Sequence, residues 1–185
     1  QSQEPKLLAE DLSPVSWPAD PELEWCPPGH GDLYPSLLSS GMLDQLRSAG
    51  FRYAMVSNSD NVGAAPSAAI ADWFAASGAP LAMEVCRRTA ADRKGGHLAV
   101  RRADGQLVLR EKAQTAAEDA DAFADVDRHR YFNTNTLWFR ADALERELPL
   151  RWYQVRKKVD GSEVVQFEQL VGQASWFLDS LFTRV

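Results

Sequence analysis

The sequence has little of what a membrane protein, a disulfide-bonded secreted protein or a nucleic-acid-binding protein needs. Only two of its 185 residues are cysteines, Cys26 and Cys86, which allow at most one disulfide and have no metal-ligand spacing. Such low cysteine use is typical of reduced thiols in the cytoplasm. No apolar run approaches the roughly 18 residues of a membrane-spanning helix, and the first residues lack a signal-peptide pattern. We therefore expect a cytoplasmic protein that does not enter a membrane.

The chain also has fewer basic than acidic residues. The chain has 20 Lys and Arg residues against 26 Asp and Glu, a formal net charge of −6. An acidic chain disfavours a surface for a nucleic-acid polymer. Basic residues cluster only in "CRRTAADRK" (86–94), which is either a solvated face or a local patch that faces a phosphate. The hydrophobic share of 45% and the charged share of 25% are ordinary for a globular protein with one core.

The order of the expected elements is that of an α/β fold. The first 35 residues hold seven of the ten prolines and are expected to be mostly irregular. A helix is predicted over 35–50, with Leu38, Met42 and Leu46 on one face and Gly50 at its end. A strand (52–58), a helix (65–78) and a strand (80–86) follow. This order predicts a right-handed crossover and a parallel pair of strands.

The pattern then changes to hairpins. Two alternating runs around Asp104-Gly105 predict a hairpin over 96–111. The remaining expected elements are a strand at 131–139, a short helix at 140–148, a brief strand at 162–169 and a helix at 167–182 that lines up Leu170, Ala174, Phe177, Leu178 and Leu181. Together these elements predict one α/β domain with a mixed sheet.

Polar residues follow the strand at 52–58. Asn58, Asp60 and Asn61 stand beside Gly63, at a strand end where open α/β sheets bind ligands. A carboxylate flanked by amides suits Mg²⁺ that bridges to phosphate oxygens. An Asx-type turn ahead of the next helix is the alternative, and turn chemistry favours the same residue types.

Two other segments carry similar signals. Lys94 precedes Gly95 and Gly96, where paired glycines admit a close backbone approach and a lysine can hold a phosphate. A tight turn with a solvated lysine is the alternative. Asn133 and Asn135 lie two apart on a strand, so they are expected on one face, bonded either to sugar hydroxyls or to internal backbone partners.

The histidines do not predict a nucleophilic enzyme. His97 and His129 are expected to be structural or exposed, and no nucleophile-elbow motif occurs. His30 lies in "EWCPPGHGDLYPSL" (24–37), between two glycines that allow the backbone to approach a ligand. Asp32 in the same segment is expected to cap the helix that begins near Pro35.

Four segments, in this order, resemble the eukaryotic-type UTP–glucose-1-phosphate uridylyltransferases (UDP-glucose pyrophosphorylases): "WCPPGHGDLYPSL", "VSNSDNVGA", "MEVCRRTAADRKGGHLA" and "FNTNTLWF". The resemblance covers nearly the whole chain. It implies a nucleotide-diphospho-sugar transferase fold, which is Rossmann-like with a mixed sheet and helices on both faces. It also implies a reaction in which UTP and glucose 1-phosphate give UDP-glucose and pyrophosphate.

The resemblance further implies roles for individual residues. Gly29 and His30 match a pair that lies along the nucleotide and sugar phosphate. Asp60 matches an aspartate that binds Mg²⁺, with Asn58 and Ser59 beside it. Lys94, Gly95 and Gly96 match the sugar end of the site, and Asn133 and Asn135 match asparagines that hold the glucose hydroxyls. No residue of the chain matches a catalytic lysine of the family.

By the same resemblance, residues 1–185 are the central part of a single catalytic domain that is incomplete at both ends. The family's glycine-rich loop, its two catalytic lysines and its carboxyl-terminal β-helix domain are expected outside this sequence, and the isolated chain is expected to be inactive. Two alternatives stay open: transfer to another sugar 1-phosphate, such as that of an N-acetylhexosamine or galactose, and a domain that only binds a sugar nucleotide.

Overall fold

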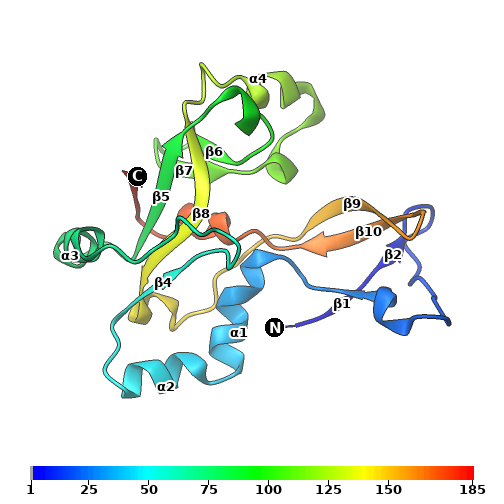
Figure 1. Cartoon of the computed structure of the whole chain (residues 1–185), viewed down its shortest axis with the longest axis horizontal. Helices are drawn as coiled ribbons and strands as arrows, with labels where there is room; N and C mark the ends of the chain where they lie inside the picture. The colour runs from blue at the N-terminus through cyan, green and yellow to red at the C-terminus, as the bar shows by residue number, and fades with distance from the viewer. Residues whose placement is uncertain (1) are drawn as a thin grey trace.

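The computed structural model describes residues 2–185, which form a sheet-based body and a narrower arm (Figure 1). The helices of the body are α1 (Leu33–Ser39), α2 (Met42–Ser48), α3 (Ala68–Ser77) and α4 (Ala120–Ala124). Its strands are β4 (Tyr53–Val56), β5 (Leu81–Arg87), β6 (His97–Val100), β7 (Leu107–Arg110), β8 (Tyr131–Arg140) and β11 (Ser180–Arg184).

The sheet is built around β8. One edge of β8 pairs antiparallel with β5, and the other pairs antiparallel with β4 and, at Phe132, with β6. Strand β7 continues the sheet beyond β6, while β11 lies parallel to β5 at the opposite edge. The sheet is therefore mixed, as the sequence predicts.

Strand β8 is central because both of its faces are apolar. Leu137 and Phe139 belong to the larger core cluster, with Leu43 of α2. Trp138 between them belongs to a second cluster with Phe74 of α3. Since alternate residues of a strand point to opposite faces, α2 and α3 cover opposite faces of the sheet. The predicted fold class, a mixed sheet with helices on both faces, is confirmed.

The prediction of a parallel pair between β4 and β5 is wrong. Residues 137–139 of β8 pair with both strands, so β8 lies between them. A crossover helix fixes the direction of the strand that follows it, but it does not determine which strand lies beside that strand in the sheet. Residues 136–139 of β8 are buried, and β8 takes the central position.

The helix predicted over 35–50 is two helices. Gly41 adopts φ 69° and separates α1 from α2, a left-handed conformation that glycine tolerates better than other residues. The break changes the buried face, because Leu43 is buried whereas Met42, predicted to face the core, is exposed. The short helix predicted at 140–148 is a single 3-10 turn, Ala141–Leu144.

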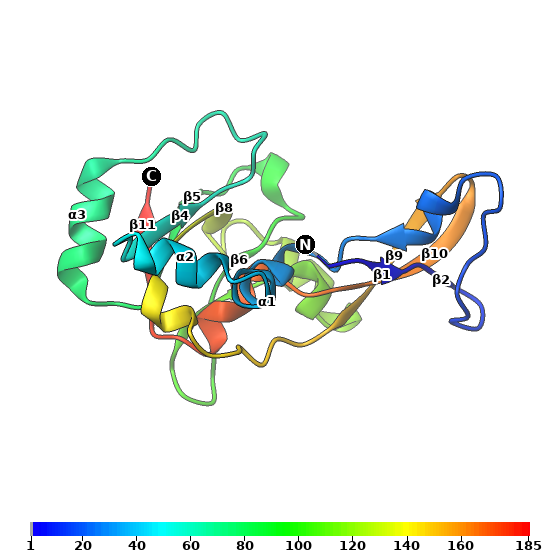
Figure 2. The same ribbon diagram turned by 90° about the horizontal axis from the view of Figure 1, so that it is seen from below.

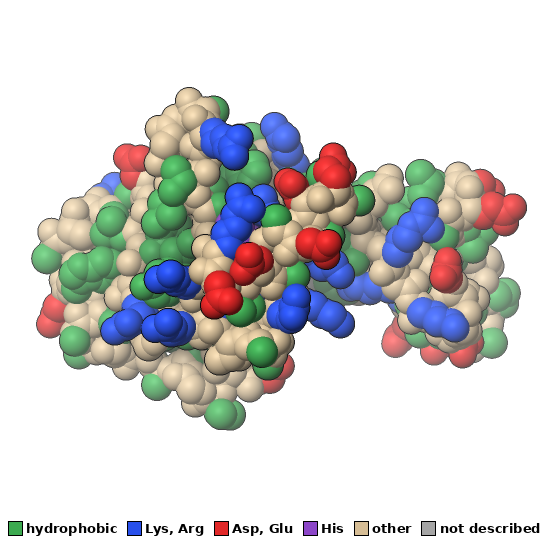
Figure 3. Space-filling view, turned by 90° about the horizontal axis from the view of Figure 1, so that it is seen from above, with side chains coloured by type: hydrophobic (Ala, Val, Ile, Leu, Met, Phe, Trp, Pro, Cys, Tyr) green, Lys and Arg blue, Asp and Glu red, His purple; other side chains and the backbone are tan. Residues whose placement is uncertain are grey.

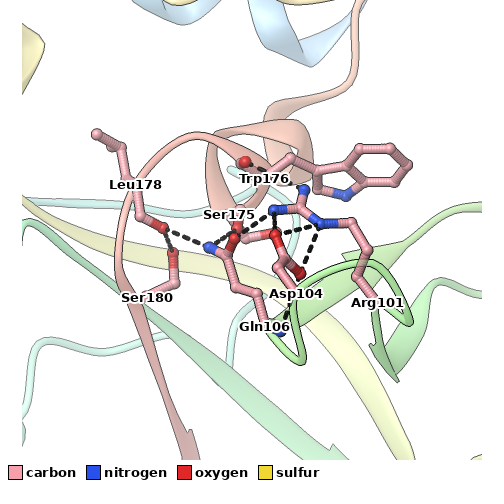
Figure 4. Close-up of polar contacts among 7 residues, drawn as sticks. All are labelled: Arg101, Asp104, Gln106, Ser175, Trp176, Leu178 and Ser180. Atoms are coloured by element: carbon pink, nitrogen blue, oxygen red, sulfur yellow. Dashed lines mark hydrogen bonds and ion pairs between the residues drawn. The ribbon is translucent and has the colours of Figure 1, made fainter.

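The hairpin predicted around Asp104-Gly105 is confirmed by the antiparallel pairing of β6 with β7. Its tip is joined to the segment that follows Gly172. The carbonyl oxygens of Ser175 and Leu178 accept hydrogen bonds from Nε2 of Gln106 at 2.9 and 3.2 Å (Figure 4). Arg101 donates to the carbonyl oxygen of Trp176 at 3.3 Å.

These bonds explain why the helix predicted at 167–182 is wrong. A helix would direct those carbonyl oxygens to amides four residues on, but here the hairpin side chains occupy them. The chain instead makes one 3-10 stretch, Val171–Trp176, and then the strand β11. The apolar spacing reflects two unrelated contacts: Ala174 is buried in the core, and Leu181 packs beside Phe74 on the opposite face.

The arm is a hairpin of β9 (Tyr153–Val159) and β10 (Ser162–Glu168), extended by β2 (Leu7–Leu8). A pair formed by β1 (Glu4–Pro5) and β3 (Trp25–Cys26) lies beside it (Figure 2). A narrow neck joins the arm to the body (Figure 3). The brief strand predicted at 162–169 is confirmed, whereas β9 was not predicted. Residues 2–32 of the Pro-rich opening segment form short strands and 3-10 turns joined by irregular chain.

The structure also bears on the expectations about surface charge, cysteine thiols and membrane helices. On the face seen in Figure 3, Lys and Arg side chains alternate with Asp and Glu rather than forming a purely basic surface. Both Cys26 and Cys86 are free thiols. Among the described residues, no helix has the length and apolar character to cross a membrane.

Candidate functional site

The site forms where the segment after β4 meets a bulge in β8. The Nδ2 of Asn135 donates a 2.6 Å hydrogen bond to Oδ1 of Asn58. These residues are 77 positions apart, and both are in the predicted site. This contact places the end of β4 and the asparagine pair side by side in the fold.

The bulge determines where Asn135 points. Pairing with β5 shifts between Glu84 and Val85, and Asn135 has φ 60°, a left-handed conformation that asparagine tolerates better than most residues. The hydroxyl of Thr134 donates to the carbonyl oxygen of Glu84 at 2.8 Å and holds the shifted register.

Strand alternation is therefore not what brings Asn133 and Asn135 together. The amide N–H of Asn135 donates to Oδ1 of Asn133 at 3.0 Å, and their carboxamides lie 3.5 Å apart. The two side chains are neighbours, as predicted, but a bulge rather than a regular strand makes them so. Their partners in the structure include other side chains, Asn58 among them, as well as backbone.

Glu111 completes the polar cluster and was missed by sequence reasoning. Its Oε1 accepts a 3.4 Å hydrogen bond from Nδ2 of the buried Asn133. Burial raises the pKa of this carboxyl, and the Asn133 bond opposes the rise only in part. Glu111 follows β7 directly, so the strand-end reasoning applied to 58–61 would have found it if extended to the hairpin.

The glycine pair at 95–96 is required by close packing within the chain. A Cβ on Gly95 would collide with the ring of Phe132, and a Cβ on Gly96 would lie 2.5 Å from Oε2 of Glu111. Gly96 also accepts a 2.9 Å bond from the amide of Asn133. The glycines therefore hold the β5–β6 loop against the asparagine strand, while the neighbouring Lys94 is exposed.

Gly29 and His30 lie at a second place, against the arm. Gly29 has φ 85°, and a Cβ there would lie 2.5 Å from the carbonyl oxygen of Gln169. The amide of Gly31 donates to that oxygen at 2.8 Å, so the loop is fixed to the end of β10. Beside it is a hollow of about 610 Å³, lined by Pro27, Gly29, His30, Asp32, Leu33, Ser36, Lys157, Gln166 and Glu168.

Asp32 occupies the N-cap position of α1, as expected, but its side chain makes no capping hydrogen bond to the helix backbone. Its carboxylate accepts from the amide and hydroxyl of Ser2 at 2.8 and 2.9 Å and from the hydroxyl of Ser36 at 2.8 Å. Burial raises the pKa of Asp32, but these hydrogen bonds outweigh burial and lower it overall. Asp32 thus ties the start of the described chain to α1.

The predicted metal ligand, Asp60, lies in the loop after β4. Asn58, Ser59 and Asp60 are exposed. Asn61 makes the Asx turn, accepting a 3.2 Å bond from the amide of Gly63, and Ser67 rather than Asp60 caps α3. Residues 2–185 contain no group of three His, Cys, Asp or Glu side chains able to hold a metal ion. An exposed carboxylate among amide oxygens fits Mg²⁺ that takes its other ligands from water and a phosphate.

The structure joins one set of the predicted residues by hydrogen bonds and leaves the others apart from it. Asn58, Asn133 and Asn135 are joined by hydrogen bonds, with Gly96 attached through the amide of Asn133. Within the described part of the chain, no hydrogen bond or ion pair links that group to Lys94 or His30.

His97 and His129 pack against each other, in line with the expectation that both are structural or exposed. The ring of His97 is fully buried and stacks on the ring of His129 at 3.7 Å. Burial lowers the pKa of His97 to about 4. The ring is therefore neutral at physiological pH and contributes packing rather than charge.

Comparison with known proteins identifies close relatives. The family model described as UTP–glucose-1-phosphate uridylyltransferase matches residues 1–182. The enzyme of that name from Solanum tuberosum is 38% identical over 185 residues, covering 97% of this chain and 38% of the relative. That from Saccharomyces cerevisiae is 42% identical over 147 residues, covering 79% of this chain and 29% of the relative.

Solved structures give the same result. UDP-glucose phosphorylase from Trypanosoma brucei is 38% identical with a TM-score of 0.92, over 100% of this chain and 44% of that one. A mutant UDP-glucose pyrophosphorylase from Leishmania major, solved in complex with UDP-glucose, is 38% identical with a TM-score of 0.85 over the same shares. The chain thus spans about two fifths of the length of these relatives.

Proposed function

The chain belongs to the UTP–glucose-1-phosphate uridylyltransferase family, and from that premise we propose that the whole protein transfers a uridylyl group from UTP to glucose 1-phosphate. The products are UDP-glucose and pyrophosphate. The fold is the nucleotidyltransferase fold of the UDP-glucose pyrophosphorylases. One observation carries the proposal furthest: the bond between Asn58 and Asn135 gathers separate polar segments into one place.

The cluster around the asparagines is the proposed sugar end of the site. Asn133 and Asn135 present carboxamides that both donate and accept, which matches adjacent hydroxyl groups. Glu111 adds an acceptor fixed by Asn133, and its desolvated carboxyl favours a partner that donates a hydrogen bond. Gly95 and Gly96 bring the β5–β6 loop against this cluster. A hexose is the ligand whose chemistry fits these groups.

The loop of Gly29 and His30 is the proposed contact for the nucleotide and sugar phosphate. The Gly29 backbone is fixed against Gln169, so the adjoining His30 is presented from a rigid turn beside the 610 Å³ hollow. The relative solved with UDP-glucose supports a sugar nucleotide as the ligand. Asn58 and Ser59 are proposed to lie beside it.

Asp60 is the proposed Mg²⁺ ligand. A bound Mg²⁺ would neutralise phosphate charge as it builds up during transfer. Asp60 is suited to this role because it is exposed and follows a strand end next to Asn58. Lys94, which is also exposed, is proposed to offset phosphate charge from the β5–β6 loop.

The proposed chemistry needs little acid–base work. A phosphate oxygen of glucose 1-phosphate attacks the α-phosphorus of UTP in line. The bond between the α-phosphorus and the oxygen that bridges to the β-phosphate breaks, and pyrophosphate leaves with that oxygen. The sugar phosphate is already ionised at neutral pH, so positioning and electrostatic stabilisation supply the rate. A site of amides, glycines and carboxylates is consistent with that requirement.

The test is pyrophosphate release by the whole protein with UTP and a series of sugar 1-phosphates. We expect glucose 1-phosphate to give the highest kcat/KM and Asn135→Ala to reduce it, with Asn61→Ala as the matched control in the neighbouring turn. Preference for N-acetylglucosamine 1-phosphate or galactose 1-phosphate would assign a different sugar. Binding of UDP-glucose without pyrophosphate release would leave only a sugar-nucleotide-binding role.

We also propose a cytoplasmic location, which the free thiols of Cys26 and Cys86 support because oxidising compartments favour disulfides. Fractionation of cells that express the whole protein tests this. Recovery with secreted or membrane fractions would contradict it.

A further inference from the structure

Arg88 is a buried cation that the proposed mechanism does not use. It follows β5 directly, and only 6% of its surface is exposed. Burying a charge is costly unless its hydrogen bonds are satisfied. No ion pair between Arg88 and a carboxylate occurs among residues 2–185. Groups other than carboxylates must therefore satisfy the donors of this buried guanidinium.

Those partners are backbone carbonyl oxygens from three segments. The oxygen of Asp92 accepts from Nη2 at 2.9 Å and from Nε at 3.3 Å, and that of Arg93 accepts from Nη2 at 3.0 Å. The oxygens of Phe123 and His129 accept from Nη1 at 3.1 and 3.4 Å. Arginine presents five N–H donors in a fixed planar fork, a geometry that suits several carbonyl oxygens held around it, whereas lysine offers three donors at a single point.

The first two carbonyls belong to the turn immediately ahead of Lys94. The amide of Gly95 donates to the same Asp92 oxygen at 3.2 Å, so Arg88 and Gly95 share one acceptor. The side chain of Asp92 also accepts from the amide and hydroxyl of Thr89 at 2.8 and 2.7 Å. The loop is thus closed around Arg88, with Gly95 at its exit.

The other two carbonyls connect this loop to the rest of the sheet edge. Phe123 lies in α4, and its ring is 5.9 Å from the guanidinium of Arg88. His129 stacks on His97, the residue that follows Gly96. Through these hydrogen bonds, the guanidinium of Arg88 joins the turn at Asp92 and Arg93 to α4 and to the segment at His129.

We propose that Arg88 is a positioning residue that fixes the Lys94–Gly95–Gly96 segment in the shape that receives the sugar phosphate. This role rests on the proposed function, because it takes that segment as part of the substrate site. Arg88 does not touch substrate. It acts through the carbonyls of Asp92 and Arg93.

The direct test is hydrogen exchange in the whole protein, followed by mass spectrometry on peptides that contain Gly95. Arg88→Lys keeps the charge but loses the fork, and Arg88→Ala removes both. We expect faster exchange of peptides containing Gly95 in both variants, with peptides from 58–66 unchanged. Arg87→Ala is the matched control, because Arg87 is the adjacent arginine and is exposed. Unchanged exchange at Gly95 would overturn the proposal. This measurement does not depend on whether the protein acts on glucose 1-phosphate.

The kinetic test separates positioning from general loss of structure. Arg88→Lys should raise the KM for glucose 1-phosphate or lower kcat by roughly ten- to a hundredfold, while the KM for UTP stays near that of the unaltered protein. Methylguanidinium added to Arg88→Ala should restore part of the loss by occupying the vacated space. Equal effects on both substrates, or loss without rescue, would assign Arg88 a structural role only.

Discussion

Two loops that carry predicted ligand residues are built in opposite ways. The β5–β6 loop is closed around the buried guanidinium of Arg88 and lies under Phe132. The β4–α3 loop is exposed from Asn58 to Gly63 and is held by local turns and the one bond to Asn135. The contrast suggests a test of the proposed site: the proposed sugar end is held by packing within the fold, whereas the proposed metal end is exposed and free to adjust to phosphate.

The largest expected effect is at the exposed loop. Asp60→Ala in the whole protein should reduce uridylyl transfer by roughly a hundredfold or more, because the proposed Mg²⁺ ligand is lost. Its melting temperature should hardly change, since the side chain is exposed. Turnover near that of the unaltered protein would mean that another group holds the metal.

A pair of glycine substitutions tests the difference in rigidity. Gly95→Ala should lower the free energy of unfolding by about 1–3 kcal/mol, because the new Cβ meets the Phe132 ring. Gly63→Ala is the matched change in the other loop, where the nearest atom is 3.5 Å from the new Cβ. We expect a change of about 0.5 kcal/mol or less there. Chemical denaturation measures both, and equal losses would remove the contrast.

Limited proteolysis of the whole protein compares directly how readily the two loops open. Subtilisin should cut within 58–66 before it cuts within 88–96, because cleavage needs backbone that opens locally. UDP-glucose with Mg²⁺ should slow the first cut more than the second. Earlier cleavage in the β5–β6 loop would reverse the assignment of rigid and adaptable ends.

The smallest expected effect concerns Glu111. Since burial raises its pKa in the folded state, the native protein binds this proton more tightly than the unfolded chain. This contribution to stability is therefore greatest below the unfolded pKa and is lost as pH rises through the folded pKa. Glu111→Gln should raise the melting temperature at neutral pH, and its advantage should disappear in acid. Melting curves across pH measure it, and a pH-independent difference would contradict it.

The elements that could be predicted are those with a local signal. Strands β4, β5 and β8 are short apolar runs, and the β6–β7 hairpin has Asp104-Gly105 at its tip. The asparagines at 133 and 135 were also recognisable, because two amides in an aromatic strand are unusual. Glu111 was missed because the strand-end argument was not extended to the residue after β7, and its contact with Asn133, 22 positions away, is visible only in the fold.

The sequence by itself determined the α/β class, the apolar strands and the family resemblance, because each depends on residue types at short spacing. Tertiary structure alone decided the place of β8 between β4 and β5, the bulge at Asn135 and the strand β11. Each of these depends on which backbone groups find partners across the fold: residues 137–139 pair on both edges, Thr134 holds a shifted register, and Gln106 takes carbonyls that a helix would have used. Such competition between local and distant hydrogen-bond partners is not encoded in spacing.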